Sequence, residues 1–389
     1  MTQAKEAPAS RSSKGGLEGV VVAPTAMSTI DGQKGLLSYR GFDICDLAEH
    51  ATFEETVYLL WYDQLPNADD LHEFSAEMAA GRPVVSEVLD AITPLAPRMS
   101  IMDLLRTGAS CLAAYDPDAR VTLDDVDAHA AANLRKASRV TAQMATLVAA
   151  SHRLRVGDAP IAPRDDLSHA ANFLYMLDGE RPDEELARVL DVALVLHADH
   201  GFNASTFSAR VTASTEADLH AAVTSAIGTL KGRLHGGANV RVMRMLRDIG
   251  SADRAEGVID ELLANNHRVM GFGHRVYKVE DPRATVLREL ARTSCERSGH
   301  GTWFEISQRV EEVMKERKPT IAPNVDFYSA STYAALGVPE DLFTAIFALS
   351  RVAGWIGHVM EQHRNNRLIR PRSDYVGKRD QAWVPLADR

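Results

Sequence analysis

Four short segments of the sequence hold the residue types that move protons near neutral pH. Histidines stand in 196–203 (LHADHGFN), 232–239 (GRLHGGAN) and 270–278 (MGFGHRVYK), and an aspartate stands in 323–329 (PNVDFYS). Glycine lets a backbone approach a ligand closely, and three of the four segments contain it. Histidine and carboxylate together are the minimum set for general acid–base chemistry. The candidate functional residues are therefore His200, His235, His274 and Asp326.

Asp326 lies between Val325 and Phe327, so its carboxylate is either exposed or partly desolvated. Desolvation raises the pKa of a carboxyl group and makes its ionised form a stronger base. The alternative from the local sequence is an ordinary helix N-cap. The pattern leaves both interpretations open.

His235 is followed by two glycines, and a helix is expected to begin after Gly237. The N–H groups at the start of that helix would point at the imidazole, lower its pKa and keep it neutral. A neutral imidazole can donate a hydrogen bond to a developing oxyanion or enolate. The alternative is a loop that only caps the helix.

The segment after Pro182 has the helical period, and we expect Gly201 to end that helix. One face carries Leu186, Leu190, Ala193, His197 and His200. A histidine on a buried stripe, such as His197, is more often a core residue than a ligand. His200, at the helix end, is free to donate to a group outside the helix.

A metal site is a weaker interpretation of the same histidines. A zinc-binding helix usually places two histidines four apart with a glutamate between them, whereas His197 and His200 are three apart. A metal-dependent hydrolase built on His197, Asp199, His200 and His235 remains an alternative.

Basic residues form local clusters although the net charge of the chain is -10. An acidic chain disfavours general binding to nucleic acid or to anionic membranes, and local clusters suggest a small anionic ligand. One cluster holds Arg275, Lys278 and Arg283, and the other holds Arg364, Arg367, Arg370 and Arg372. The alternative is a solvated surface. Asp281-Pro282 predicts a helix start that would fix the direction of Arg283.

The segment after Pro339 predicts a helix with two distinct faces. Arg351, Trp355, His358 and Gln362 share one face, and Ser350, Gly354 and Gly357 form a small-residue face that permits close helix contact. A buried arginine without a sequence-local partner suggests a bound carboxylate, which guanidinium holds in a bidentate fork.

Two other classes of chemistry find little support. Gly271-Phe272-Gly273 lacks the third glycine and the βαβ pattern of a dinucleotide fold. Neither cysteine nor serine stands beside a histidine in a nucleophile motif, which disfavours a covalent acyl-enzyme.

The elements that carry these residues are mainly helical. Thr52 and Glu55 predict a capping box, and strand-like alternation is confined to a hairpin over 27–39 with its turn at Asp31-Gly32. The fold class is therefore all-α with a minor N-terminal β-hairpin. The chain has 389 residues, enough for about two domains, and a helical segment over 253–314 could form an inserted smaller domain between His235 and Asp326.

The cysteine content, the N-terminal segment and the lengths of the apolar runs indicate the cellular compartment that we expect for the protein. The three cysteines, Cys45, Cys111 and Cys295, are too few and too widely spaced for a disulfide framework or a zinc ribbon, which fits a reducing cytoplasm. Residues 1–15 lack an apolar core, so we expect disorder there rather than a secretory signal. We expect no membrane span, because no apolar run approaches ~20 residues.

In this order and spacing, the four segments resemble the citrate synthase family, and so does 39–44 (YRGFDI). The resemblance runs from about Gly16 to the C-terminus. It is greatest to the shorter prokaryotic branch, which includes citrate and 2-methylcitrate synthases. The resemblance implies a helical homodimer with a large domain (16–237 and 339–389) and a smaller mobile domain (238–338). It also implies condensation of acetyl-CoA with oxaloacetate, then hydrolysis to citrate and CoA, with no metal and no redox cofactor.

The resemblance assigns a role to each matching position. Asp326 would take a proton from the acetyl methyl group, His235 would hydrogen-bond the thioester oxygen, and His274 would polarise and protonate the oxaloacetate carbonyl. The residues that would bind oxaloacetate are His200, Arg283, Arg351 and, from the partner subunit, Arg370. The residues that would touch CoA are Arg275, Lys278 and Lys318.

Two positions depart from the family pattern. Gly201 follows His200 where many members have an acidic residue. Ser329-Ala330 stands where many citrate synthases have Ser-Gly and where 2-methylcitrate synthases often have Ser-Ala. Acetyl and propionyl groups differ by one methylene, worth only ~1–3 kcal/mol of discrimination. We favour acetyl-CoA, with 2-methylcitrate synthase as the alternative, and a non-enzymatic helical scaffold with structural histidines as the third hypothesis.

Overall fold

The computed structural model describes residues 15–17, 19–121 and 125–389. The expectation of disorder over 1–15 falls, except for Gly15, outside the described residues. In the first half of the chain the helices are α1 (Ile44–His50), α2 (Phe53–Tyr62), α3 (Ala68–Ala80), α4 (Ser86–Ile92), α5 (Ile101–Leu112), α6 (Val126–Val156), α7 (His169–Asp178) and α8 (Glu184–His197). In the second half they are α9 (Ala204–Ala213), α10 (Leu219–Leu230), α11 (Ala238–Ile249), α12 (Ala252–Ala264), α13 (Pro282–Ser298), α14 (Gly301–Arg317), α15 (Val325–Ala335) and α16 (Phe343–Arg364).

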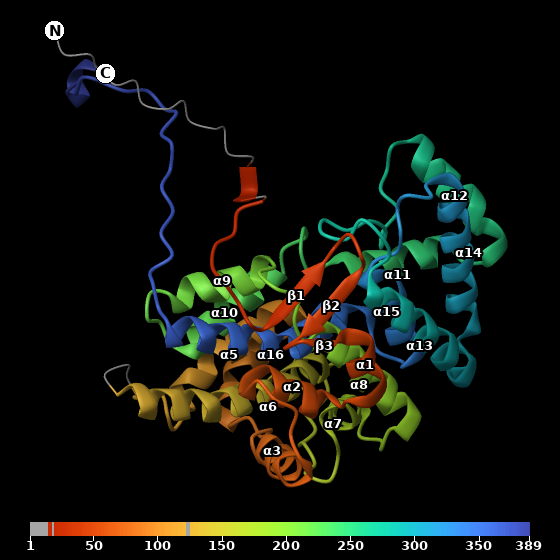
Figure 1. Cartoon of the computed structure of the whole chain (residues 1–389), viewed down its shortest axis with the longest axis horizontal. Helices are drawn as coiled ribbons and strands as arrows, with labels where there is room; N and C mark the ends of the chain where they lie inside the picture. The colour runs from red at the N-terminus through yellow and green to blue at the C-terminus, as the bar shows by residue number, and fades with distance from the viewer. Residues whose placement is uncertain (1–14, 18, 122–124) are drawn as a thin grey trace.

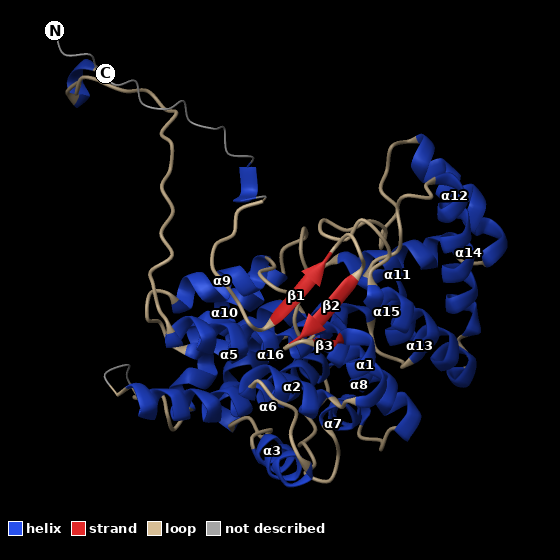
Figure 2. Cartoon of the chain, in the orientation of Figure 1, coloured by secondary structure: helices blue, strands red, loops and turns tan. Residues whose placement is uncertain are grey.

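Helices dominate the molecule, and the only strands of the described chain form one small sheet (Figure 2). The capping box predicted at Thr52 is present, since Glu55 N–H donates to the Thr52 hydroxyl and Thr52 N–H donates to the Glu55 carboxylate. Asp281 caps α13, as the Asp281-Pro282 pair predicted. The predicted all-α class is confirmed.

α16 lies at the centre of the larger group of helices, where it packs against α2, α5, α6, α8, α9 and α10 (Figure 1). Segment 340–364 is long and apolar enough to cross a membrane by length and composition, contrary to the expectation that no apolar run would be. Its most apolar window is completely buried in the protein, as the core helix of a folded protein is. Burial among six neighbouring helices explains its apolar composition.

The sheet confirms the predicted hairpin and adds a third strand. β1 (Ser28–Asp31) pairs antiparallel with β2 (Leu36–Tyr39), and β2 pairs antiparallel with β3 (Phe42–Asp43). The turn of the hairpin touches the segment after His274, because Lys278 N–H donates to the Gly32 carbonyl at 2.8 Å. A Cβ atom at Gly32 would lie 2.3 Å from the Val276 carbonyl oxygen, so this contact requires glycine.

Helices α11 to α15 form a second group at one side of the molecule (Figure 1). Within it α12 packs on α14, and α15 packs on both α11 and α13. The group meets the rest of the protein where α13 contacts α1 and α8 and where α11 contacts α16. His200 comes from the larger group, whereas His274 and Asp326 come from the smaller one.

Candidate active site

The turn that follows α8 places His200. The helix ends at His197 and not directly before Gly201, so the predicted helix end was wrong. Tertiary hydrogen bonds replace the helical ones, since Gly354 N–H of α16 donates to the Ala198 carbonyl at 3.1 Å. A Cβ atom at Gly354 would lie 2.4 Å from that oxygen, which confirms the close helix contact predicted for this small-residue face.

His197 is completely buried, and its Nδ1 lies 2.7 Å from the Ala193 carbonyl oxygen. Burial lowers the pKa of His197 to about 3, so the ring is neutral. This is the environment of a core histidine. Within the described ranges, no group of three or more His, Cys, Asp or Glu side chains is arranged to hold a metal ion.

His200 meets two aromatic side chains of the 274–277 segment. Its Nε2 lies 3.2 Å from the Tyr277 hydroxyl, and its ring centroid lies 5.4 Å from that of His274. The pKa of His200 falls well below its ordinary value because of burial and of the positive charges of Arg283 and Arg351. Tyr277 was not singled out from the sequence, and only its position three residues after His274 hinted at it.

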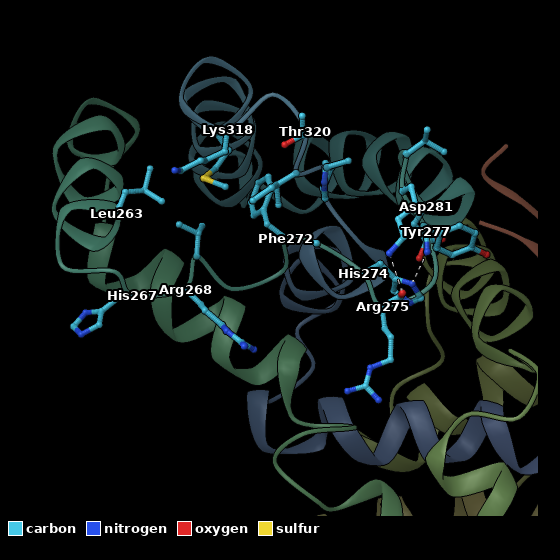
Figure 3. A pocket seen from close by; sticks show the side chains of 18 residues that line it. Leu263, His267, Arg268, Phe272, His274, Arg275, Tyr277, Asp281, Lys318 and Thr320 are labelled. Carbon is cyan, nitrogen blue, oxygen red and sulfur yellow. Dashed lines mark hydrogen bonds between the residues drawn. The ribbon is translucent and has the colours of Figure 1, made fainter. Parts of the chain in front are cut away.

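The hydrogen bonds of His274 fix which ring nitrogen carries the proton. The N–H groups of Val276 and Tyr277 both donate to Nδ1, at 3.0 and 3.1 Å. His274 and Tyr277 are drawn in Figure 3. Nδ1 is therefore an acceptor, and the proton of the neutral ring is on Nε2. Burial and the charge of Arg283 lower the pKa of His274 to about 4, so the neutral form dominates at pH 7.

A short antiparallel bridge links the His274 segment to the start of α15. Asn324 N–H donates to the Gly271 carbonyl, and Gly273 N–H donates to the Ala322 carbonyl, each at 2.9 Å. The Asn324 side chain caps α15 and also donates to the Gly273 carbonyl. Gly271 has a φ of 81°, and a Cβ there would lie 2.7 Å from the Phe327 ring. These contacts fix the start of α15 beside the segment that carries His274.

Asp326 lies in the first turn of α15, with Asn324 as the N-cap, so the N-cap interpretation of Asp326 was wrong. Burial raises the pKa of Asp326 to about 6, although the charges of Arg283, Arg241 and Arg351 oppose the shift. The carboxyl group is therefore mostly ionised at pH 7 and still more basic than an ordinary aspartate. This is the partly desolvated state that its apolar sequence neighbours suggested.

His235 is also neutral, but with the opposite tautomer. The Ser205 N–H donates to His235 Nε2 at 3.2 Å, and the Ser205 hydroxyl lies 2.8 Å from the same nitrogen. With Nε2 as the acceptor of the backbone N–H, the proton of the neutral ring is on Nδ1. A helix start does face the imidazole, as predicted, but this N–H belongs to α9 and not to the helix after Gly237. Burial and the charge of Arg351 lower the pKa of His235 to about 4. The sequence offered no signal for this contact, because Ser205 is thirty residues away.

Two buried arginines differ in their partners. Arg283 forms a two-point ion pair with Asp281, at 3.0 and 2.7 Å. Arg351 donates from Nε to the His197 carbonyl at 2.5 Å and stacks over the Phe347 ring at 4.6 Å. The two terminal nitrogens of Arg351 form no hydrogen bond with the described part of the chain. These two nitrogens of the guanidinium group are therefore available to bind a carboxylate, which is the role that the sequence pattern suggested for a buried arginine.

Arg370 is exposed in the segment after α16, which runs away from the helical body (Figure 1). The structure therefore does not bring Arg370 to the site of its own chain.

The charges of the two buried arginines shift the pKa values of the histidines and of the aspartate in the site. Arg283 lowers the pKa values of His200 and His274, and Arg351 acts on His200, His235 and Asp326.

A cavity of about 600 Å³ extends from His274 and Tyr277 over the smaller group of helices (Figure 3). Arg275, Lys278 and Lys318, the three residues predicted to contact CoA, all line it. His267 and Arg268 also line it and were missed. Two consecutive basic residues, which follow the end of α12 after Asn265 and Asn266, were the signal that could have indicated them.

Proteins of known family resemble this chain over nearly its whole length. The family model described as "Citrate synthase, C-terminal domain" matches residues 16–372. The chain belongs to the citrate synthase family. A citrate synthase of Haloferax volcanii is 53% identical over 379 residues, covering 97% of this chain and 99% of that protein. A 2-methylcitrate synthase of Mycobacterium tuberculosis is 43% identical over 365 residues, covering 94% of this chain and 90% of that protein.

A solved structure shares the fold over nearly the whole chain. It is the ternary complex of carboxymethyl coenzyme A and oxaloacetate with the citrate synthase of Thermoplasma acidophilum. The TM-score is 0.89 at 31% identity, covering 96% of this chain and 98% of that chain. The resemblance of the four segments to the citrate synthase family is thereby confirmed.

Proposed function

We propose that this member of the citrate synthase family condenses acetyl-CoA with oxaloacetate and hydrolyses the product to citrate and CoA. The observation that carries the proposal is the combination of one basic carboxylate with two neutral imidazoles of opposite tautomer. The pKa of Asp326 is raised to about 6, whereas the pKa values of His235 and His274 are lowered to about 4. Near pH 7 this set supplies a base and two hydrogen-bond donors.

Asp326 is proposed to take the first proton. A methyl C–H beside a thioester is a very weak acid, so its removal needs a base on one side and a donor to the enolate oxygen on the other. The Asp326 carboxylate accepts the methyl proton, and the Nδ1–H of His235 donates to the thioester oxygen. The Ser205 N–H at His235 Nε2 supports this assignment, because it leaves Nδ1 as the donor.

His274 is proposed to act on oxaloacetate. The enolate carbon attacks the ketone carbon, a C–C bond forms, and the ketone oxygen takes a proton from His274 Nε2. The two N–H groups at Nδ1 stabilise the electron density that the ring then gains. Water afterwards cleaves the thioester of the product and releases CoA and citrate.

Oxaloacetate carries two carboxylates, so its site needs fixed positive charge. We assign this role to His200, Arg283 and Arg351, and the free fork of Arg351 is the strongest support. Arg370 is proposed to complete the site of a second copy, which makes a homodimer the active form. Its exposure on a segment that leaves the body supports this assignment.

CoA is proposed to lie in the cavity beside His274, where Arg275, Lys278 and Lys318 would meet its phosphates. We further propose that residues 238–338 are a smaller mobile domain and that 16–237 and 339–389 form the large one. Closure of such a domain would exclude water until condensation is complete. A cytoplasmic location is part of the proposal, and the three free cysteines support it.

The proposal is tested by thiol release from acetyl-CoA in the presence of oxaloacetate. We expect rapid formation of free CoA, and we expect Asp326→Asn to lower kcat by about 10³-fold because the base is removed. Retained turnover in this variant would overturn the mechanism.

Propionyl-CoA in the same assay tests the acyl preference. The expected result is a kcat/KM lower than that for acetyl-CoA by about tenfold, within the range that one methylene can supply. A preference for propionyl-CoA would support the 2-methylcitrate alternative instead. Loss of activity on chelation of metals would favour the hydrolase alternative.

A further inference from the structure

His358 is a completely buried side chain that the proposed mechanism does not use. It lies on α16, seven residues after Arg351 and on the same face. Its Nε2 lies 3.2 and 3.3 Å from the two carboxylate oxygens of Asp199. Its Nδ1 lies 3.2 Å from Arg210 Nη1 and 3.8 Å from the Glu361 carboxylate. His358 therefore joins α16 to the turn between α8 and α9.

Asp199 closes the turn that holds His200. Gly201 N–H donates both to the Asp199 side chain, at 3.3 Å, and to the Ser28 hydroxyl, at 3.1 Å. The Ser28 hydroxyl in turn donates to Asp199. A side-chain acceptor that binds the N–H two residues later encloses the intervening residue, here His200.

The backbone of Asp199 is held as well. The Tyr39 hydroxyl donates to the Asp199 carbonyl at 2.9 Å, and Asp199 N–H lies 3.1 Å from the same hydroxyl oxygen. The backbone is thus fixed from the sheet, whereas the carboxylate is fixed from Ser28, Gly201 and His358. His358 is the contributor that comes from the central helix.

His358 also contacts the next part of the turn. The Phe202 ring meets the His358 ring edge-on at 5.4 Å, and the Arg210 guanidinium lies 4.5 Å from the centre of the Phe202 ring. Arg210 is bound to Glu361 at 2.6 Å. The charged groups that face His358 are therefore Asp199 from the turn, Arg210 from α9 and Glu361 from α16.

A buried carboxylate without a donor is costly, so loss of His358 would weaken the position of Asp199. Asp199 already has one oxygen without a conventional hydrogen-bond partner, which leaves it dependent on the His358 contact. A shift of Asp199 would loosen the turn and move His200, which faces His274. α16 would still hold Arg351, so the damage would be confined to the His200 side of the site.

We propose that His358 is a positioning residue for oxaloacetate binding, which acts by holding the Asp199 carboxylate so that the 198–203 turn presents His200 to the substrate. The inference rests on the proposed function, in which His200 binds oxaloacetate. It adds a residue that touches no substrate and determines where a binding residue lies.

The test compares two replacements of His358 in the full chain. His358→Met keeps a similar volume but removes the donor, whereas His358→Gln keeps an N–H near the position of Nε2. We expect His358→Met to raise KM for oxaloacetate by about tenfold and His358→Gln to restore it to within about threefold of wild type. KM for acetyl-CoA should change by less than about twofold in both variants.

His363→Met is the matched control, because His363 is on the same helix and faces His129 and Asn133. It should leave both KM values unchanged. Unchanged KM for oxaloacetate in His358→Met would overturn the inference, and so would an equal rise for both substrates or the absence of rescue by glutamine.

If His358→Met does not fold, Ser28→Ala removes another donor to Asp199 and should raise KM for oxaloacetate by about threefold. No change in that variant would also overturn the inference. Failure of the proposed function can be distinguished from failure of this inference, because in the former case the wild-type protein itself would release no CoA.

Discussion

His235 and His274 in the candidate active site each have one ring nitrogen occupied by a backbone N–H, whereas His358 behind the 198–203 turn lies beside two carboxylates. The pKa values of the first two fall to about 4 because burial disfavours the imidazolium and positive charges add to the effect. Burial and the charge of Arg210 also lower the pKa of His358, but Asp199 and Glu361 more than offset them, and the pKa rises. The partner of a buried histidine, and not its burial alone, determines its protonation.

The difference in hydrogen-bond partners separates two roles of buried histidines in this protein. A histidine that must donate one proton from a known nitrogen is held neutral by main-chain donors, which cannot change with pH. A histidine that must anchor a carboxylate is held by that carboxylate. Variants that change one kind of partner at a time distinguish the two roles.

His274→Asn should have the largest effect. The variant removes the Nε2–H that is proposed to protonate the oxaloacetate oxygen, and kcat should fall by about 10³-fold. Thermal unfolding should show that the variant still folds, and KM for acetyl-CoA should stay close to wild type. A kcat within about tenfold of wild type would show that another group supplies the proton.

Ser205→Pro addresses the main-chain donor itself. Proline removes the N–H that faces His235 Nε2, and Ser205 lies in the first turn of α9, where proline is least disruptive to a helix. The same N–H also donates to the Asn203 cap at 3.2 Å, so thermal unfolding must show that the variant still folds. Without this donor His235 can adopt the other tautomer, so kcat should fall by roughly 10–100-fold.

Ser205→Ala is the matched control, since it keeps the N–H and loses only the hydroxyl that lies 2.8 Å from His235. It should lower kcat by less than about fivefold. Equal losses in the two variants would assign the effect to the hydroxyl and contradict the role of the backbone.

The pH dependence of kcat/KM tests the carboxylate that acts with these imidazoles. Asp326 must be ionised to act as a base, and its pKa is raised to about 6, so activity should be lost as pH falls through 6. The decrease from pH 7 to pH 5 should be about tenfold. His235 and His274, with pKa values of about 4, remain neutral over this range. A profile that is flat down to pH 5 would contradict the raised pKa.

Asp326→Asn should lower activity, but it should slightly raise the stability of the fold. A carboxyl group whose folded pKa lies above its unfolded pKa stabilises the fold below the unfolded value and loses that contribution as pH rises through about 6. At pH 7.5 the variant should therefore unfold at a temperature higher by roughly 2–4 °C. The difference should decrease at pH 4.5, and a less stable variant at pH 7.5 would contradict the account.

The sequence was sufficient to predict structural features that depend only on neighbouring residues. The capping box at Thr52, the hairpin and the helix start at Asp281 depend on neighbouring residues, and the structure confirms all three. Arg351 was recognised because a buried guanidinium on an apolar helix needs an acceptor to offset the cost of its burial. The end of α8 was misplaced because Tyr39 and Gly354, far away in the chain, compete for the backbone of the last turn.

Tyr277, His267 and Arg268 lie near sequence signals that could have indicated them, whereas the other missed parts of the site are long-range contacts. Ser205 meets His235 across thirty residues, and Asp199 meets His358 across 159. The hairpin turn at Gly32 touches the segment after His274, although nothing in either segment indicates the other. Sequence patterns predict which residues are suited to chemistry, but the packing of helices decides which donor each of them meets.

Histidine-selective ¹⁵N NMR of the protein at pH 7, assigned with the His235, His274 and His358 variants, tests the central claim most directly, because nitrogen shifts distinguish the protonation state of each ring nitrogen. We predict that His235 is neutral with its proton on Nδ1, that His274 is neutral with its proton on Nε2, and that His358 titrates at a higher pH than either. An imidazolium at His235 or His274 at pH 7, or the same tautomer at both, would contradict the account.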